Sequence, residues 1–166
     1  MGAQVLFVCS GNTCRSPMAA ALLRRLLGER CRDLIVTSAG TAALEQAAAS
    51  EHAQEVMRRR GLDLGNHRAR AVTAEMVRSA TLILTMTAEH KARLLSLDPQ
   101  AAGKVFTLKE FAGEEGEVED PVGGGLETYE RCAAELEELL RKIMPKLQGW
   151  CEGERHERGA AGGSGV

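Results

Sequence analysis

The chain alternates between short apolar runs and longer segments in which apolar residues recur every three or four positions. The short runs are rich in Val, Leu, Ile and Thr and predict β-strands, and the near-continuous apolar character of residues 3–8 is typical of a central strand buried on both faces. The longer segments have the period of amphipathic helices. Strands are expected at residues 3–8, 34–37, 80–86 and 104–107. Helices are expected at residues 16–28, 50–60, 73–79, 87–97 and 126–147, with a helical turn at 108–111.

This order of elements predicts the class of fold. Strands that alternate with helices form a parallel sheet with helices on both faces. Each helix carries the chain back to the end of the sheet at which the previous strand began. A chain of 166 residues is long enough for one hydrophobic core and short for two. We therefore expect a single α/β domain over residues 1–150. Residues 151–166 have little apolar periodicity and are expected to form a disordered tail.

Composition and charge narrow the classes of partner. The formal net charge is -2, the charges are scattered, and one Trp, one Tyr and three Phe offer little for base stacking, so nucleic acid is not an expected partner. No apolar run approaches the length of a membrane span or of a signal peptide, so we expect no membrane association and a cytoplasmic location.

The cysteines and histidines give no sign of a disulfide framework or a metal site. The cysteines are odd in number and include no Cys-x-x-Cys pair, so all are expected to be thiols. They are Cys9, Cys14, Cys31, Cys132 and Cys151. The four histidines lack the spacing of metal ligands on a helix, so neither a metal nor another cofactor is predicted.

The turn between the first strand and the first helix carries the strongest chemical signal. Cys9 and Arg15 bracket the run Cys9-Ser10-Gly11-Asn12-Thr13-Cys14-Arg15-Ser16, and Pro17 follows at the start of the helix. Such a turn directs backbone N–H groups and the positive end of the helix dipole into one concavity, which suits an oxyanion. These donors and a nearby cation are expected to lower the pKa of Cys9.

The spacing of the two residues indicates covalent phosphoryl transfer. The planar guanidinium of Arg15 can hold two phosphoryl oxygens while Cys9 attacks the phosphorus. A cysteine-containing turn with an incidental arginine would have the same spacing. It would not require Gly11-Asn12 at the turn or Ser16-Pro17 at the helix start.

A general acid is also required, because the leaving group departs far more readily when it is protonated. Asp120 is the candidate, since Asp120-Pro121 lies in the Gly- and Glu-rich segment 113–125, which has the length of a functional loop. After it loses its proton, the same carboxylate can activate water against the cysteinyl-phosphate. An Asp-Pro turn without a chemical role is the alternative.

Five segments of the chain together resemble the low-molecular-weight protein-tyrosine-phosphatase family, over residues 3 to about 147. They are Val5 to Ala19, Ser38-Ala39-Gly40-Thr41, Asn66-His67-Arg68-Ala69, Leu84-Thr85-Met86-Thr87 and Asp120-Pro121. The resemblance implies a flavodoxin-like three-layer fold with a four-stranded parallel sheet, phosphorylated proteins as substrates, no cofactor and a monomer. It implies that Cys9 is the nucleophile, Arg15 the phosphate clamp and Asp120 the acid and base.

The resemblance also implies roles for the rest of the loop and its neighbours. The phosphate would be bound by Ser10, Gly11, Asn12, Thr13, Cys14, Arg15 and Ser16. Ser16 would stabilise the thiolate, and Ser38 and His67 would support the shape of the loop around Asn12, although both also suit a purely structural role. Cys14 is a candidate redox partner, which could trap oxidised Cys9 as a reversible disulfide.

Thr13 bears on the choice of substrate. Tyrosine-directed members of the family usually carry a branched aliphatic residue at this position, whereas bacterial protein arginine phosphatases carry threonine, as this chain does. A hydroxyl can form a hydrogen bond with a guanidinium group or with the attacking water. The segments Val105 to Glu110 and Asp120 to Gly124 also look like that subgroup.

Phosphoarginine is therefore the favoured substrate, and phosphotyrosine is the alternative. It also stays open that Thr13 has no influence on the choice of substrate. Val122 departs from the family pattern, because an aromatic residue commonly follows Asp-Pro.

Two other functions fit the loop less well. Arsenate reductases of the same fold use further cysteines near the middle of the chain, and none lies between Cys31 and Cys132. A non-catalytic phosphopeptide-binding module would not need both Cys9 and Asp120.

Overall fold

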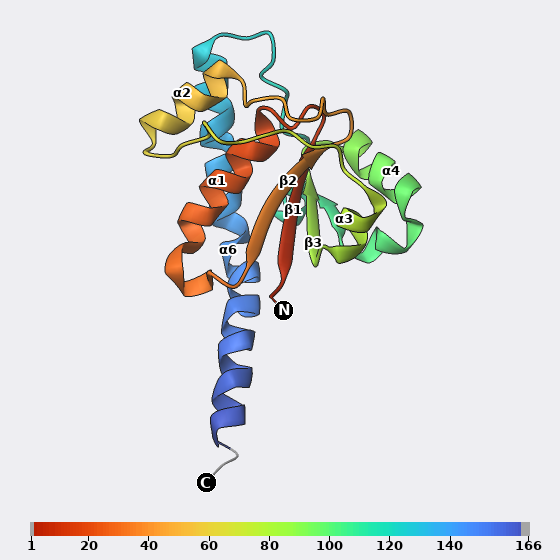
Figure 1. The fold of residues 1–166 in the computed structure, drawn as a ribbon, viewed down its shortest axis with the longest axis vertical. Coiled ribbons are helices and arrows are strands. Elements are labelled where there is room, and N and C mark those ends of the chain that lie inside the picture. Colours follow the sequence, from red (N-terminus) through yellow and green to blue (C-terminus); the bar gives the residue numbers. More distant parts are fainter. Residues whose placement is uncertain (1, 164–166) are drawn as a thin grey trace.

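A four-stranded parallel sheet forms the centre of the molecule (Figure 1). The computed structural model describes residues 2–163, and the side chains of residues 2–151. The strands are β1 (Gln4–Cys9), β2 (Ile35–Gly40), β3 (Leu82–Thr85) and β4 (Val105–Thr107). Their order across the sheet is β2-β1-β3-β4, so β1 is a central strand with a partner on each side. The predicted fold class is confirmed.

Helices cover both faces of the sheet. Helices α1 (Arg15–Leu27), α2 (Glu51–Arg59) and α6 (Leu126–Gly163) lie on one face, where α6 packs against both α1 and α2. Helices α3 (Ala74–Ser79) and α4 (Ala88–Leu97) lie on the opposite face (Figure 1). The short helix α5 (Leu108–Phe111) directly follows β4. Two 3-10 helices, η1 (Gly28–Cys31) and η2 (Pro99–Gly103), were not predicted.

The side chains of β1 alternate between two hydrophobic cores. Val5 and Phe7 belong to the larger core under α1 and α6, whereas Leu6 and Val8 belong to the smaller core under α3 and α4. Each of these four side chains is almost fully buried. This double burial explains why β1 is apolar at nearly every position, and it fixes the carboxyl end of β1, where Cys9 lies beside Gly40 of β2.

Capping residues place the starts of several helices where the sequence predicts them. The Ser50 hydroxyl accepts a hydrogen bond from the backbone N–H of Ala53 and caps α2, and Thr87 caps α4 in the same way. Gly28 ends α1 with a positive φ of 58°, which glycine adopts without steric cost. The 3-10 helix η2 begins at Pro99, directly after α4 ends.

Helix α6 is longer than the sequence predicts. It continues to Gly163, whereas we expected a helix that ends near residue 147 and a disordered segment over residues 151–166. Residues 151–163 contain no proline and include Glu, Arg and Ala, which favour helix, but also four glycines, which do not, so the sequence gives no strong helical signal there. Extension of a helix that is already formed upstream avoids the cost of nucleation. Residues 164–166 lie outside the described residues.

One disulfide contradicts the prediction that all five cysteines are thiols. Cys31, at the end of η1, is bonded to Cys151 of α6, and their Cα atoms are 5.2 Å apart. The sequence could not show this pair because 120 residues separate the two cysteines, and they meet only where α6 packs along α1. Cys9, Cys14 and Cys132 are buried free thiols, as expected.

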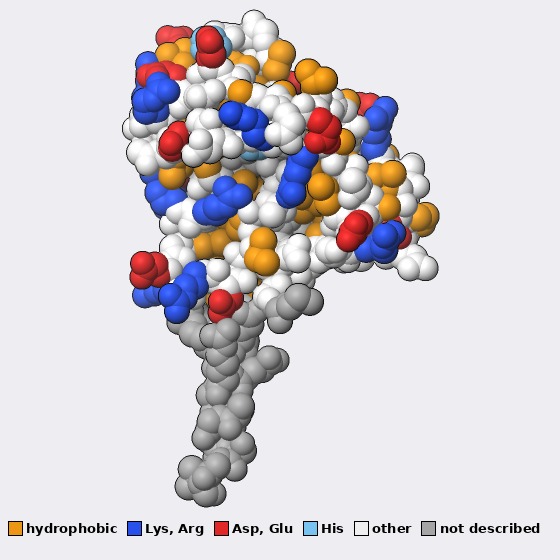
Figure 2. Space-filling view, viewed as in Figure 1, with side chains coloured by type: hydrophobic (Ala, Val, Ile, Leu, Met, Phe, Trp, Pro, Cys, Tyr) orange, Lys and Arg blue, Asp and Glu red, His pale blue; other side chains and the backbone are white. Residues whose placement is uncertain are grey.

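Charged side chains of both signs are mixed on the surface. Figure 2 shows one face on which Lys and Arg side chains are interspersed with Asp and Glu rather than gathered in a stripe of one sign. Across the part of the chain that the structure describes, no helix combines the length and the apolarity that crossing a membrane requires.

Candidate active site

The loop from Cys9 to Ser16 is held in shape by Asn12, which is fully buried. Asn12 has a φ of 56°, a left-handed conformation that is uncommon for residues other than glycine. Its Nδ2 donates to the hydroxyls of Ser16, at 2.8 Å, and Ser38, at 2.9 Å. Its Oδ1 accepts from the backbone N–H of Arg70 at 3.0 Å. The structure therefore brings the predicted pair Asn12 and Ser38 together.

His67 supports the same turn from outside. Its Nε2 lies 2.7 Å from the carbonyl oxygen of Asn12, and since a carbonyl can only accept, the ring donates. Burial lowers the pKa of His67, so the ring is neutral at physiological pH with its proton on Nε2. The predicted contact between His67 and the loop is present.

Gly40 permits the close approach of β2 to the loop. A Cβ atom at this position would lie 2.3 Å from the carbonyl oxygen of Ser10 and 3.0 Å from the nitrogen of Asn12. Any other residue would push the loop away from the sheet.

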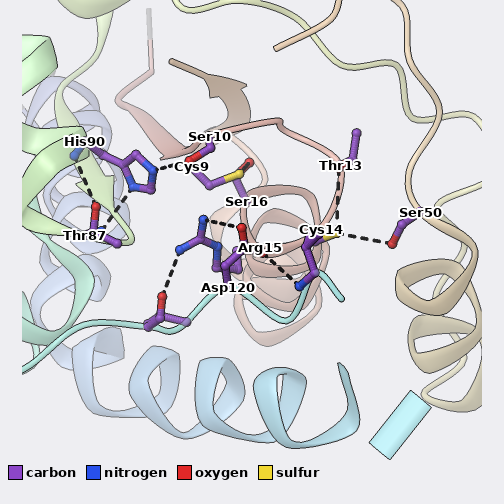
Figure 3. A network of polar contacts seen from close by, with 12 residues as sticks. Cys9, Ser10, Thr13, Cys14, Arg15, Ser16, Ser50, Thr87, His90 and Asp120 are labelled. Carbon is purple, nitrogen blue, oxygen red and sulfur yellow. Dashed lines mark hydrogen bonds and ion pairs between the residues drawn. The ribbon is translucent and has the colours of Figure 1, made fainter. Parts of the chain in front are cut away.

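Cys9 lies at the base of the loop, where its side chain is 2 % exposed. Its Sγ is 2.9 Å from the Ser16 hydroxyl (Figure 3). Burial is the largest influence and raises the pKa of Cys9, while the Ser16 hydroxyl and the Arg15 charge lower it. The prediction that the pKa of Cys9 is lowered is therefore wrong, because the sequence indicates the hydrogen-bond donors but not the depth of burial.

Arg15 links the loop to the segment that carries Asp120. Its Nη1 donates to the carbonyl oxygen of Val118 at 2.9 Å, and its Nη2 lies 3.5 Å from Oδ2 of Asp120 (Figure 3). The Arg15 side chain is 4 % exposed, whereas that of Asp120 is 47 % exposed. The predicted nucleophile, clamp and acid thus come together from β1, the first turn of α1 and the loop before α6.

Cys14 contacts two hydroxyl groups outside this cluster. Its Sγ lies 3.3 Å from the hydroxyl of Ser50 and 3.5 Å from that of Tyr129. Burial, with the Cys14 contact second, raises the pKa of Tyr129 to about 12. Cys9 and Cys14 are both free thiols, and their redox pairing stays a prediction.

Thr13 lies in the loop two residues before Arg15, and Val122 lies two residues after Asp120. Thr13 is half-buried, and among the described residues its hydroxyl has one side-chain contact, with Cys14 Sγ at 3.7 Å. Val122 is 64 % exposed, and its backbone N–H donates to Oδ1 of Asp120 at 3.1 Å.

Two residues near the loop, His90 and Tyr129, were not predicted to belong to the site. His90 Nε2 lies 2.8 Å from the hydroxyl of Ser10 (Figure 3). The only signal for His90 was its position three residues after Thr87, which is the spacing of a capping box. Tyr129 carries no local signal, because its contact with Cys14 spans 115 residues. Within the described residues, no three His, Cys, Asp or Glu side chains gather as metal ligands.

Comparison with known proteins identifies the family. The family described as low molecular weight phosphotyrosine protein phosphatase matches residues 4–150. A protein-arginine-phosphatase of Geobacillus stearothermophilus is 42% identical over 146 residues, which are 87% of this chain and 96% of that protein. A probable low molecular weight protein-tyrosine-phosphatase of Ralstonia nicotianae, EpsP, is 38% identical over 88% of this chain and 92% of its own length.

A solved structure gives the same result for the fold. The crystal structure of a low molecular weight protein tyrosine phosphatase from T. tengcongensis superposes with a TM-score of 0.83, at 44% identity over 87% of this chain and 99% of that one. The chain therefore belongs to the low molecular weight phosphotyrosine protein phosphatase family.

Proposed function

We propose that this protein hydrolyses phosphorylated protein side chains through a cysteinyl-phosphate on Cys9, and that phosphoarginine is its preferred substrate. The proposal is supported by the convergence of a buried thiol, a buried guanidinium and a half-exposed carboxylate within one site.

In the first half-reaction, the thiolate of Cys9 attacks phosphorus and the bond to the leaving nitrogen or oxygen breaks. The loop N–H groups and Arg15 hold the non-bridging oxygens, while protonated Asp120 gives its proton to the leaving group. The hydrogen bond from Arg15 to Val118 fixes the direction of the guanidinium. The Ser16 hydroxyl, 2.9 Å from Sγ, favours the thiolate against the effect of burial.

In the second half-reaction, Asp120 acts as a base. Its carboxylate takes a proton from water, the water oxygen attacks phosphorus, and the S–P bond breaks to release inorganic phosphate. The thiolate that leaves is stabilised by the same Ser16 hydroxyl. One carboxyl group thus serves both steps, and the protein returns to its starting state.

The presence of Thr13 is the main reason to propose phosphoarginine as the preferred substrate. Among the described residues its hydroxyl makes one side-chain contact, a long one with Cys14 Sγ at 3.7 Å, so it is available to bind a polar group of the substrate. A guanidinium offers several N–H donors for such a hydroxyl, whereas a phenyl ring offers none. Val122 leaves the rim without the aromatic wall that would pack on a phenyl ring.

Overall identity is a weaker guide to the substrate. The protein-arginine-phosphatases of Geobacillus stearothermophilus and Bacillus subtilis are 42% and 41% identical to this chain. The T. tengcongensis protein, named as a tyrosine phosphatase, is 44% identical. The residue at position 13, rather than overall identity, therefore supports phosphoarginine.

The test is phosphate release from phosphoarginine and phosphotyrosine peptides of the same flanking sequence, with kcat/KM measured for each. We expect a preference for phosphoarginine of about tenfold or more, which corresponds to ~1.4 kcal/mol in the transition state. A reversed preference would make the protein a tyrosine phosphatase with the same mechanism. Cys9→Ser should abolish turnover of both peptides while inorganic phosphate still binds, and substantial turnover by this variant would rule out the covalent mechanism.

A further inference from the structure

The capping boxes of α4 and α5 differ at one residue. In α5, Thr107 Oγ1 accepts from the N–H of Glu110, and the Glu110 carboxylate accepts from the N–H of Thr107. In α4, Thr87 Oγ1 accepts from the N–H of His90, and Nδ1 of His90 accepts from the N–H of Thr87 at 3.2 Å. Glu or Gln is usual at this third position, so the cap alone does not explain a histidine.

The second ring nitrogen of His90 explains the difference. Because Nδ1 accepts a hydrogen bond, the proton of the neutral ring is on Nε2, which donates to the Ser10 hydroxyl at 2.8 Å. Burial, followed by the nearby charge of Arg15, lowers the pKa of His90 to about 4, so the ring is neutral at physiological pH. A glutamate would cap the helix but would bring a negative charge toward a loop that suits an anion.

The turn that contains His90 also holds the segment before Asp120. The backbone N–H of Ala88 donates to the Glu117 carboxylate at 2.6 Å, and the N–H of Val118 donates to the carbonyl of Met86 at 3.1 Å. The Val118 carbonyl in turn accepts from Arg15. Residues 86–90 therefore contact both the loop that begins at Cys9 and the loop that carries Asp120.

Ser10 is held from two sides. Its carbonyl oxygen accepts from the N–H of Ala42 at 2.9 Å, next to β2. Its hydroxyl is bound by His90, next to β3 and α4. Without the second contact, Ser10 itself would lose its side-chain link to α4, although Val8 before the loop would still accept from the N–H of Met86.

We propose that His90 is a positioning residue for the phosphatase reaction, which fixes Ser10 and the start of the phosphate-binding loop relative to the loop of Asp120. This inference rests on the proposed function. A site positioned in this way should lose two properties when the contact between His90 and Ser10 is removed: affinity for an oxyanion, and efficient protonation of the leaving group.

Three variants separate this role from helix capping. Ser10→Ala removes the contact and leaves the cap of α4 intact. His90→Ala removes both, and His90→Gln keeps both, because an amide can accept from Thr87 and donate to Ser10. Glu89→Gln is the matched control, since Glu89 is an exposed neighbour on the same turn.

The measurements are kcat/KM for a series of aryl phosphates of different leaving-group pKa, and the Kd of inorganic phosphate by calorimetry. We expect Ser10→Ala and His90→Ala each to lower kcat/KM and phosphate affinity by about tenfold and to make the rate depend more steeply on leaving-group pKa. The double variant should be little worse than either single one. His90→Gln should recover most of the loss, and Glu89→Gln should stay within about twofold of the parent.

Unchanged phosphate affinity and an unchanged leaving-group dependence in Ser10→Ala would overturn the proposal and leave His90 as a helix cap. The aryl phosphate series does not depend on the preference for phosphoarginine. If the parent protein binds phosphate but hydrolyses no substrate, the proposed function fails, and the phosphate affinities of the variants still decide the role of His90.

Discussion

Arg15 and Asp120 form an ion pair in which the two partners differ sharply in exposure: Nη2 and Oδ2 are 3.5 Å apart, with the arginine buried and the aspartate half-exposed. Arg15 is also fixed by its hydrogen bond to Val118. A phosphoryl group bound by this guanidinium would lie close to the Asp120 carboxyl group. The pair therefore joins the proposed clamp to the proposed acid, and the exposure of Asp120 leaves it accessible to water for the second half-reaction.

Asp120→Asn should slow turnover by roughly 10²–10⁴-fold, because the amide keeps the shape of the side chain but can neither give nor take the proton. The rate is to be measured with phosphoarginine and phosphotyrosine peptides, and the cysteinyl-phosphate should accumulate in acid-quenched samples analysed by mass spectrometry. Glu119→Gln is the control, as an exposed carboxylate one residue away. Equal rates for Asp120→Asn and the parent protein would remove Asp120 from the mechanism.

Ser16→Ala should raise the pKa of Cys9 further, because the Ser16 hydroxyl is the largest influence that lowers it. The rate of Cys9 alkylation by iodoacetamide, followed against pH, reports the thiolate directly. The profile of the variant should move to higher pH than that of the parent. Ser96→Ala, an exposed hydroxyl on α4, should leave it in place. If the profiles of Ser16→Ala and the parent coincide, Ser16 does not stabilise the thiolate.

Thr13→Ile should shift preference toward phosphotyrosine, since it exchanges a hydroxyl for methyl groups that pack on a ring. Thr13→Val separates the two effects, because it removes the hydroxyl at nearly constant size. We expect kcat/KM for phosphoarginine to fall in both variants, by about tenfold, and kcat/KM for phosphotyrosine to rise in Thr13→Ile. A constant ratio of the two values across the three proteins would show that position 13 does not select the substrate.

The disulfide between Cys31 and Cys151 should contribute about 2–4 kcal/mol to the free energy of unfolding, because it closes a long loop in the unfolded chain. Reduction of the parent protein, or the change Cys31→Ser, should therefore lower Tm by several degrees. Reductant should have no effect on the Tm of the variant. A parent protein that shows no cross-link by mass spectrometry under non-reducing conditions would contradict the pairing.

Most of the fold could be predicted because local signals and tertiary packing agree. The continuous apolar character of β1 reflects its burial on two faces, and Ser50 and Thr87 cap their helices through contacts within one turn. Such signals extend over a few residues and can be recognised in the sequence. The pairing of Cys31 with Cys151 cannot, because it depends on how α1 and α6 pack.

In the active site, too, the local features could be predicted from the sequence and the long-range contacts could not. The loop of Cys9 and Arg15 is one continuous segment, so its residue types and spacing already indicate an oxyanion cradle. The contact of Ser10 with His90 spans 80 residues and has no local signature. The pKa of Cys9 was predicted in the wrong direction because burial depends on the whole fold, whereas the donors are nearby in sequence.

His90 also predicts a specific dependence of stability on pH. Its pKa is about 4 in the folded protein, below the ordinary value of 6.5, because burial and Arg15 outweigh the opposite effects of Glu89, Glu117 and Asp120. Above about pH 6.5 the ring is neutral in both the folded and unfolded states, and its contribution to stability is complete. As the pH falls toward 4, the unfolded chain takes up a proton that the folded protein does not, so this contribution is lost.

His90→Gln removes the titration but keeps the capping acceptor and the donor to Ser10. The free energy of unfolding by urea, measured at about pH 7.5 and about pH 5, should therefore fall more for the parent protein than for the variant. The other histidines and the carboxylates titrate in both proteins and cancel in the difference. Parallel decreases in the two proteins would show that His90 titrates normally, in conflict with a ring that accepts a hydrogen bond from Thr87 and donates one to Ser10.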